Sequence, residues 1–208
     1  MNASRSKADT IVARAVAAIR AGEVVMLPTD TVYGLAATAY RAAGTDALYR
    51  LKRRDPAQPS ALVAPTVALQ FECVPELRGR LGRMAAALLP GPYTLVLPNP
   101  ARRFAWLCGN DPTSIGVRVP ELAGPAAAVL ATVAAVVATS ANVPGGPEPR
   151  TVEEIPEALR AGAAVVVDGG ELPGVPSTVL DLTGSAPRVV REGAGDVDTA
   201  LARLAALV

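Results

Sequence analysis

Residues 77–97, LRGRLGRMAAALLPGPYTLVL, predict a helix, a break and a strand in direct succession. Apolar residues recur at helical intervals from Leu77 to Leu89, and Pro90-Gly91-Pro92 cannot continue that helix. The apolar run Tyr93–Leu97 that follows is closed by a proline and is typical of a buried strand. Helical and strand patterns alternate in the same way along the rest of the chain, which favours an α/β fold.

The other predicted elements complete this alternation. Asn142–Pro149 holds three prolines and two glycines and is predicted as a loop. We see no linker or repeat, so residues 10–208 are expected to form one domain and residues 1–9 a flexible N-terminus. Further helices are expected at Thr10–Ala21, Thr45–Arg54, Pro125–Ala134, Thr151–Ala161, where Thr151 opens a capping box, and Asp196–Leu207. Further strands are expected at Glu23–Leu27, Ala61–Ala64, Ile115–Val119, Ala135–Ala138, Ala163–Val167, Thr178–Leu182 and Val189–Arg191.

Composition excludes several functional classes. The 208 residues are 50% hydrophobic but only 3% aromatic, and 20 basic residues face 19 acidic ones, a net charge of +1. Such balance argues against a nucleic-acid scaffold or a membrane-surface protein. The chain has no histidine, so it cannot build a Ser-His-Asp or Cys-His relay. Two distant cysteines, no apolar leader and no long apolar run predict a cytoplasmic protein without a disulfide framework or membrane span.

Two polar clusters follow predicted elements near the N-terminal end. Pro28-Thr29-Asp30-Thr31-Val32-Tyr33-Gly34-Leu35 comes directly after a strand and is either a ligand-facing turn or a turn that its own hydroxyls stabilise. Lys52-Arg53-Arg54 ends a helix and is either a cationic cap or a polyphosphate clamp. Because residues two apart on a helix diverge by about 200°, Lys52 and Arg54 can share a ligand only if the helix has ended there. Asp55-Pro56 supports such an end.

Two more polar groups interrupt apolar strands. Arg118 lies inside Ser114-Ile115-Gly116-Val117-Arg118-Val119-Pro120, where a charge is costly unless an internal carboxylate or an anionic ligand pairs with it. Glu121 is the only acidic residue nearby in sequence. Thr139-Ser140-Ala141-Asn142 ends a strand with small hydroxyl and amide groups that suit sugar, phosphate or loop-capping contacts. Neither a Walker A motif nor a G-x-G-x-x-G fingerprint is present.

Together and in order, these motifs resemble one family. P-T-D-T-V-Y-G-L, K-x-R, L-L-P-G-P-Y-T-L-V-L, S-I-G-V-R-V-P, T-S-A-N, and S-T-V-L-D-L followed by R-x-G-A are similar to the YrdC-type threonylcarbamoyl-AMP synthases, in their short single-domain form. The resemblance runs from about Val24 to Ala194. It implies one α/β domain whose twisted mixed sheet and flanking helices surround a large, positively charged cavity.

The resemblance also implies an activity. Such an enzyme forms threonylcarbamoyl-AMP and pyrophosphate from L-threonine, bicarbonate and ATP. A threonylcarbamoyl transferase complex then modifies a tRNA adenosine, so tRNA contact is conceivable for the chain itself. The implied cofactor is Mg²⁺ carried mainly by the ATP phosphates, with no metal site of the protein's own.

The family's functional residues carry over position by position. No side-chain nucleophile is required, because threonine carbamate attacks, and Lys52 and Arg54 are expected to stabilise transition-state charge. Arg118 is expected to receive the threonine carboxylate as a two-point ion pair. The ATP-binding residues implied are Lys52, Arg54, Gln58, Ser114, Ser140, Asn142, Arg150 and Arg191. The threonine-binding residues implied are Thr31, Arg118 and Ser177.

The sequence departs from the family pattern after K-x-R. Gln58 stands where Lys or Asn is usual, and Val63 stands where a histidine is frequent. Gln58 keeps hydrogen bonding but loses a charge, which puts substrate preference in question rather than nucleotide binding. Two other functions therefore stay open: a paralogue with a different carbamoyl or acyl substrate, and an RNA-binding module.

Overall fold

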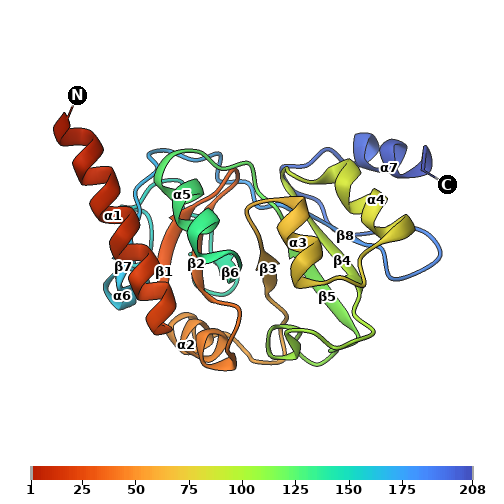
Figure 1. The fold of residues 1–208 in the computed structure, drawn as a ribbon, viewed down its shortest axis with the longest axis horizontal. Helices are drawn as coiled ribbons and strands as arrows, with labels where there is room; N and C mark the ends of the chain where they lie inside the picture. Colours follow the sequence, from red (N-terminus) through yellow and green to blue (C-terminus); the bar gives the residue numbers. More distant parts are fainter. Residues whose placement is uncertain (1, 208) are drawn as a thin grey trace.

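A computed structural model describes the backbone of residues 2–207 and the side chains of residues 7–207. Its strands form one mixed sheet in the order β7-β1-β2-β6-β3-β5-β4-β8-β9 (Figure 1). The strands are β1 (Val25–Pro28), β2 (Tyr33–Thr38), β3 (Ala61–Val63), β4 (Tyr93–Pro98), β5 (Ser114–Arg118), β6 (Val136–Ser140), β7 (Val165–Val166), β8 (Thr178–Asp181) and β9 (Arg188–Arg191). The helices are α1 (Asn2–Ala21), α2 (Ala42–Lys52), α3 (Val67–Cys73), α4 (Gly79–Leu88), α5 (Gly124–Val133), α6 (Glu157–Gly162) and α7 (Val197–Ala205), with a 3-10 turn η1 (Ala105–Leu107). The predicted α/β class is confirmed.

The short strand β3 joins the two halves of the sheet. On one side it runs antiparallel to β6, with Leu62 opposite Val137, and on the other it runs parallel to β5, with Leu62 opposite Val117. Beyond β6 lies the hairpin β1–β2, and beyond β5 lie β4 and β8. Strand β3 therefore lies between the β1–β2–β6 group of strands and the β5–β4–β8 group.

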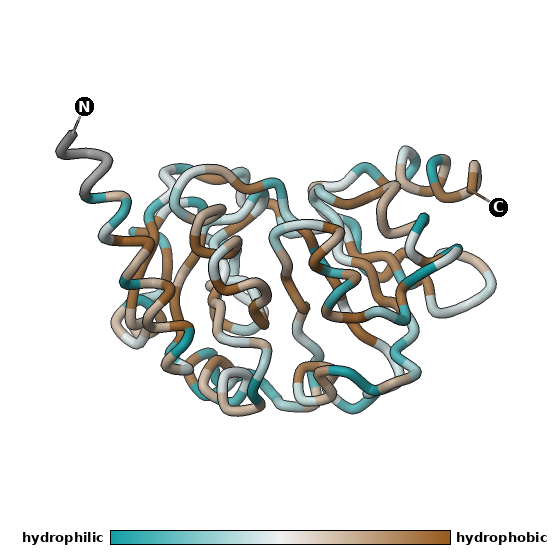
Figure 2. Tube along the Cα trace, in the orientation of Figure 1, coloured by the Kyte–Doolittle hydropathy of each residue, from teal (hydrophilic) through white to brown (hydrophobic). Residues whose placement is uncertain are grey.

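Helices cover both faces of the sheet. Buried side chains of α2, α4, α6 and α7 belong to the main core on one face, whereas α1 and α5 pack together over the β1–β2–β6 part of the other face. Figure 1 shows α1 and α7 at opposite ends of the long axis. In Figure 2 the hydrophobic stretches lie mainly along the central strands, and the hydrophilic ones lie mainly at helix ends and loops. No helix within residues 2–207 has the length and hydropathy needed to cross a membrane.

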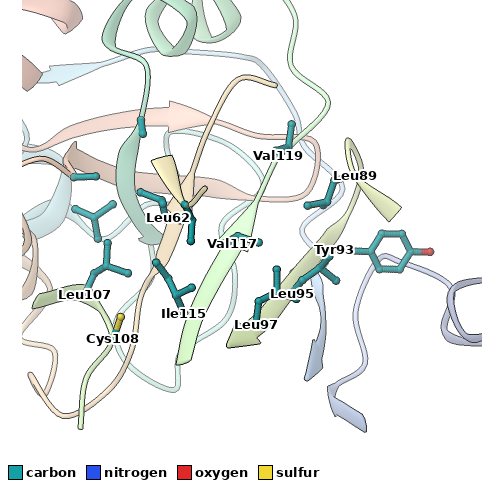
Figure 3. Close-up of a cluster of buried hydrophobic side chains, with 14 of the residues drawn as sticks. Leu62, Leu89, Tyr93, Leu95, Leu97, Leu107, Cys108, Ile115, Val117 and Val119 are labelled. Carbon is teal, nitrogen blue, oxygen red and sulfur yellow. The ribbon is translucent and has the colours of Figure 1, made fainter. Parts of the chain in front are cut away.

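Side chains alternate between the two faces along each strand, as a pleated backbone requires. On β5, Ile115 and Val117 are buried in the main core, and on β4, Leu95 and Leu97 join them (Figure 3). Tyr93 extends toward the C-terminal segment, where its hydroxyl donates to Asp196 O at 3.0 Å. The residues between these core positions face the opposite side, where they line a cavity described below.

Two elements were missed by the sequence patterns, and most of the others shift by one to three residues. Strand β2 begins within the segment predicted as a turn, because only residues 29–32 turn and the chain from Tyr33 pairs with β1. Helix α3 lies in a stretch for which no element was predicted; Thr66 caps it by accepting from Leu69 N at 3.1 Å. The loop predicted at Asn142–Pro149 is confirmed.

The predicted helix Thr151–Ala161 is wrong in its first half. Helix α6 begins only at Glu157, and residues 151–155 form turns. The physical reason is Pro156, whose ring disfavours the helical conformation at Ile155. Thr151 therefore opens no capping box.

The first helix begins at Asn2 rather than at the predicted Thr10. The predicted flexible N-terminus, residues 1–9, includes Met1 and the side chains of residues 2–6, which lie outside the described residues, as does Val208 at the end of the predicted domain. The domain bounds, 10–208, and the flexibility of residues 1–9 stay predictions.

Shortening a side chain of the main core should lower the free energy of unfolding much more than shortening an exposed side chain. Leu95→Ala should lower the free energy of unfolding by about 2–5 kcal/mol, because Leu95 has no exposed surface and its loss leaves a cavity. Val143→Ala, in a side chain that is 48% exposed, should change it by less than about 0.5 kcal/mol. Urea denaturation followed by circular dichroism measures both, and equal effects would contradict this assignment of the core.

Candidate functional site

The sheet face opposite the main core carries a cavity of about 620 Å³. Ligand cavities commonly measure about 300–1,000 Å³, so this one can hold a nucleotide. Small residues at successive cavity-facing positions leave the room for it. A Cβ added to Gly116, for example, would meet no atom closer than Ser60 O at 3.8 Å. The small cavity-facing residues are Gly34, Ala36, Ala61, Gly116 and Ala138.

Most of the residues predicted from sequence reach this cavity. Its lining residues carry three cationic side chains, all of them arginines, and no carboxylate among the residues that the structure describes. The predicted residues that line it are Arg54, Gln58, Ser114, Arg118, Ser140, Ser177 and Arg191. Four others lie outside the lining, namely Thr31, Lys52, Asn142 and Arg150, and each has other contacts.

The end of helix α2 separates Lys52 from Arg54 as the sequence required. The helix ends at Lys52, and Arg53 adopts the left-handed conformation with φ of 52°. Arg54 then leaves the helix axis and lines the cavity, where its Nη2 donates to Pro59 O at 2.8 Å. The condition that the helix ends between the two cations is thus confirmed, although only Arg54 lines the cavity.

Lys52 is only 3% exposed and binds the Thr139–Asn142 segment. Its Nζ lies 2.5 Å from Ser140 O, 2.9 Å from Asn142 Oδ1, 3.2 Å from Ser140 Oγ and 3.4 Å from Thr139 Oγ1. The two motifs, 87 to 90 residues apart, therefore form one network. Within it, Ser140 Oγ donates to Asn142 Oδ1 at 2.7 Å, and Asn142 Nδ2 donates to Gly146 O at 2.7 Å.

The environment of Lys52 makes its charge sensitive to pH. The pKa of Lys52 is lowered to about 8, mainly by burial and also by repulsion from Arg54, while attraction to Glu148 opposes the change. The ammonium is thus charged at neutral pH but loses its proton in mildly alkaline solution. Its positive charge acts on the cavity through the segment that carries Ser140.

Arg118 has an internal carboxylate as a partner, which is one of the two alternatives that the sequence left open, and the threonine contact implied for it stays a prediction. Its Nη2 donates to Asp30 Oδ1 at 2.5 Å and to Thr31 Oγ1 at 2.7 Å. The sequence did not indicate Asp30 as the partner, because Asp30 lies 88 positions away from Arg118, in the hydroxyl-rich turn. Arg118 Nε is buried with no hydrogen-bond partner among the described residues. One edge of the guanidinium is therefore occupied, and Nε remains available to an acceptor.

Thr31 supports Arg118 from behind instead of lining the cavity. It is fully buried, and its Oγ1 also lies 3.1 Å from Thr29 Oγ1. Thr29 stabilises the turn by donating to Val32 O at 2.7 Å and accepting from Val32 N at 3.2 Å. The interpretation as a turn stabilised by its own hydroxyls is therefore confirmed, and the turn also positions a cavity cation, while its contact with a ligand stays a prediction.

Ser177 and Arg191 reach the cavity from the β8–β9 end of the sheet. Arg191 donates from Nη2 to Ser177 O at 2.8 Å and from Nε to the same oxygen at 3.2 Å. The Ser177 hydroxyl lies 2.8 Å from Thr94 Oγ1, a cavity residue that the sequence patterns did not single out. Burial lowers the pKa of Arg191, and Glu148 opposes this. These contacts fix the guanidinium beside the cavity before any ligand is bound.

Arg150 lies away from the lining. It forms an exposed ion pair with Glu171 at 2.6 Å, and its Nε donates to Leu172 O at 3.3 Å. The nucleotide contact implied for it stays a prediction.

Three residues that line the cavity carry a buried polar atom without a hydrogen-bond partner among the described residues, namely Arg54 Nε, Ser60 Oγ and Arg118 Nε. Buried polar atoms are normally paired, so these atoms indicate where a polar ligand belongs. Ser60 was not predicted as a site residue, and only its burial in the folded chain reveals it. Further unpaired atoms belong to Thr45, Gln70 and Glu148, which lie outside the lining.

The site shows no metal cage of its own. No cluster of three or more acidic or cysteine side chains that could hold a metal ion exists in the part of the chain that the structure describes. Cys73 and Cys108 are both free thiols.

A mixed-sheet α/β protein with an arginine-lined cavity of nucleotide size is the class that the fold and the site define. The chain belongs to the Sua5/YciO/YrdC family, whose model, described as "Telomere recombination", matches residues 17–193. The predicted resemblance is therefore confirmed.

Two curated relatives share the function that the resemblance implied. The threonylcarbamoyl-AMP synthase of Homo sapiens is 36% identical over 180 residues, which cover 81% of this chain and 62% of the human protein. The threonylcarbamoyl-AMP synthase of Pyrococcus abyssi is 32% identical over 177 residues, which cover 84% of this chain and 52% of the archaeal one. The chain thus spans between half and two thirds of the length of these two relatives.

Solved structures show the same fold. The crystal structure of P. abyssi Sua5 complexed with L-threonine matches with a TM-score of 0.76 and 29% identity, over 89% of this chain and 54% of that one. The structure of Escherichia coli YciO matches with a TM-score of 0.78 and 27% identity, over 92% of this chain and 93% of that one.

The lowered pKa of Lys52 predicts that nucleotide binding weakens in alkaline solution. ATP affinity should fall as the pH rises through about 8, because the ammonium loses its proton there. The loss should stay below about 1.5–3 kcal/mol, the value of a direct contact to a charged group, because Lys52 lies behind Ser140. Calorimetric titrations between neutral pH and pH about 9.5 measure it; the upper limit stays below the usual pKa of an exposed lysine.

The chain has two lysines, so substitution of Lys7 is the matched control for substitution of Lys52. Lys7→Met should retain the pH dependence, whereas Lys52→Met should bind weakly at every pH. An affinity that stays constant across this range in the unsubstituted protein would contradict the role of Lys52.

Proposed function

We propose that the cavity forms L-threonylcarbamoyl-AMP and pyrophosphate from L-threonine, bicarbonate and ATP. One observation carries this proposal: motifs from six separate segments meet at a single cavity, in a chain whose curated relatives are threonylcarbamoyl-AMP synthases. The chain is thus an enzyme of the nucleotidyltransferase type, and its product serves the threonylcarbamoyl-adenosine modification of tRNA.

The reaction needs no nucleophile from the protein. The threonine amine adds to carbon dioxide from bicarbonate and loses a proton, which gives a carbamate. A carbamate oxygen then attacks the α-phosphorus of ATP, the bond from that phosphorus to the bridging oxygen of the β-phosphate breaks, and pyrophosphate leaves with the electron pair. Positioning and charge stabilisation lower the barrier of such a transfer.

The triphosphate is assigned to the cations of α2 and β9. Arg54 and Arg191 line the cavity, and Lys52 adds its charge from behind Ser140. Fixed cations beside the leaving pyrophosphate stabilise the charge that develops there. Mg²⁺ enters with ATP and neutralises part of the phosphate charge.

Threonine is assigned to the Arg118 end. Asp30 and Thr31 hold one edge of the guanidinium, and the unpaired Nε offers a donor to the threonine carboxylate. The two-point ion pair expected between the Arg118 guanidinium and the threonine carboxylate is thereby revised to a contact from Nε, because Nη2 already donates to Asp30 and Thr31. Support for threonine in such a fold comes from the threonine complex of P. abyssi Sua5.

The partners of the reaction follow from its product. A mixed anhydride of a carbamate and AMP is reactive, so we include in the proposal a cytoplasmic transferase complex that passes the threonylcarbamoyl group to tRNA, and a direct tRNA contact of the chain. A paralogue with another carbamoyl or acyl substrate is the less favoured alternative, as is an RNA-binding module, because the named relatives are synthases.

The reaction itself gives the first test. With ATP, Mg²⁺, bicarbonate and L-threonine, the protein should release pyrophosphate and form threonylcarbamoyl-AMP, detected by mass spectrometry. Omission of either threonine or bicarbonate should abolish both signals. Pyrophosphate release that ignores these two substrates, or an AMP adduct formed from carbamoyl phosphate instead, would contradict the proposal.

Arg118→Lys tests the threonine site. Lysine keeps the charge but loses the planar fork that reaches Asp30, Thr31 and the carboxylate together, so KM for threonine should rise more than KM for ATP. Steady-state kinetics with each substrate varied in turn measures the two constants. Arg191→Lys, a second cavity arginine, is the matched control and should raise KM for ATP instead. Equal effects of Arg118→Lys on both constants would refute the assignment.

A further inference from the structure

Thr94 is a cavity residue to which none of the assignments above gives a role. It lies on β4 next to Leu95, which is buried in the main core, so the Thr94 side chain projects to the cavity face. Its Oγ1 lies 2.8 Å from Ser177 Oγ, and Ser177 Oγ accepts from Arg191 Nη2 at 3.3 Å. The two hydroxyls therefore form one hydrogen-bonded unit, the Thr94–Ser177 pair, which an arginine holds in place.

The Thr94–Ser177 pair keeps one hydroxyl proton for a ligand. Each hydroxyl carries one proton, and only one of the two is used between the oxygens, whichever residue donates. The bond from Arg191 brings a proton of its own and uses none from the pair. Neither hydroxyl donates to a further acceptor among the described residues. The pair thus offers one donor to a cavity whose described lining residues include three arginines and no carboxylate.

The pair also lies between the arginines assigned to the two substrates. On one side it contacts Arg191, which is assigned to the triphosphate. On the other side, β4 and β5 pair with Leu95 opposite Val117, so the next position along the strands brings Thr94 beside Arg118 on the cavity face. Arg118 is assigned to the threonine carboxylate. The pair is therefore placed where the two substrates must meet.

One reacting group still lacks a partner in the site, namely the carboxylate that bicarbonate supplies. The carbamate nitrogen is bonded to the same carbon atom as the threonine carboxylate, so the carbamate lies near Arg118. One of its oxygens must also reach the α-phosphorus, on the side of Arg191. There is room for it, because a Cβ added to Gly116 would meet Thr94 Cγ2 only at 3.9 Å. A carboxylate only accepts hydrogen bonds, so a single donor between two arginines suits it.

We propose that the Thr94–Ser177 pair binds the carboxylate group of threonine carbamate. The inference rests on the proposed function, because it needs threonine at Arg118 and ATP at Arg191. The electron pair of the threonine nitrogen forms the bond to the carbon of carbon dioxide, one C=O electron pair moves to oxygen, and the nitrogen loses a proton to water. The pair donates a hydrogen bond to one carbamate oxygen while the other attacks phosphorus, and neither hydroxyl is consumed.

Steady-state pyrophosphate release tests the pair, with bicarbonate varied in buffer freed of carbon dioxide and with ATP and L-threonine saturating. Thr94→Val keeps the shape of the side chain but removes the hydroxyl. It should raise KM for bicarbonate about tenfold and change KM for threonine and for ATP less than about twofold. Thr94→Ser keeps the hydroxyl and should retain the original KM for bicarbonate. Thr183→Val, which removes an exposed hydroxyl outside the cavity lining, is the matched control and should change none of these constants.

A double variant tests whether the two hydroxyls act together. Ser177→Ala keeps the backbone oxygen that holds Arg191 and should also raise KM for bicarbonate. The double variant with Thr94→Val should be little worse than either single variant, because both remove the same interaction. Additive losses would overturn the idea of one unit.

The remaining outcomes separate this inference from the proposed function. An unchanged KM for bicarbonate in Thr94→Val would overturn the inference alone. A raised KM for threonine, with threonine no longer preferred over valine, would also overturn it, because the pair would then bind the threonine hydroxyl. If the unsubstituted protein shows no bicarbonate-dependent release of pyrophosphate, the proposed function fails together with this inference.

Discussion

Strict alternation of side chains across the sheet is the constraint on which the site depends. The same strands that bury Leu95, Leu97, Ile115 and Val117 in the main core present their intervening residues to the opposite face. Those residues are glycine, alanine, serine or threonine at many positions, so part of that face stays open as a cavity, while α1 and α5 cover its β1–β2–β6 part. Stability and binding are thus divided between the two faces of one sheet.

The second feature of the site is its set of four cationic side chains. Lys52 and Arg118 are buried, Arg54 is half-buried and Arg191 is exposed, and each is fixed by contacts that precede any ligand. Placing cations in a region poor in water costs free energy, and paired oxygens from Asp30, Ser140 and Ser177 offset part of it. Preorganised charge of this kind stabilises anionic ligands without further rearrangement. Chemistry without histidine is therefore feasible here.

The sequence could predict the strands and most of the site because both depend on local patterns. Apolar runs closed by proline located β4 and β5, and Asp55-Pro56 indicated that α2 ends between Lys52 and Arg54. It could not predict Asp30 as the partner of Arg118, because pairing across 88 residues depends on the fold and not on spacing. Likewise it could not predict a role for Thr94, because only the folded chain brings that hydroxyl beside Ser177. Strand β2 was missed because Gly34 and Ala36, which line the cavity, are residues of low strand propensity, so the segment lacks a strong strand pattern.

The central claim is that one cavity holds ATP and threonine together. A crystal structure of the protein with a non-hydrolysable ATP analogue, Mg²⁺ and L-threonine tests it most directly. The account predicts phosphate oxygens within hydrogen-bond distance of Arg54 and Arg191, and the threonine carboxylate within hydrogen-bond distance of Arg118. A nucleotide bound outside the cavity, or threonine bound away from Arg118 while Asp30 keeps the guanidinium to itself, would contradict it.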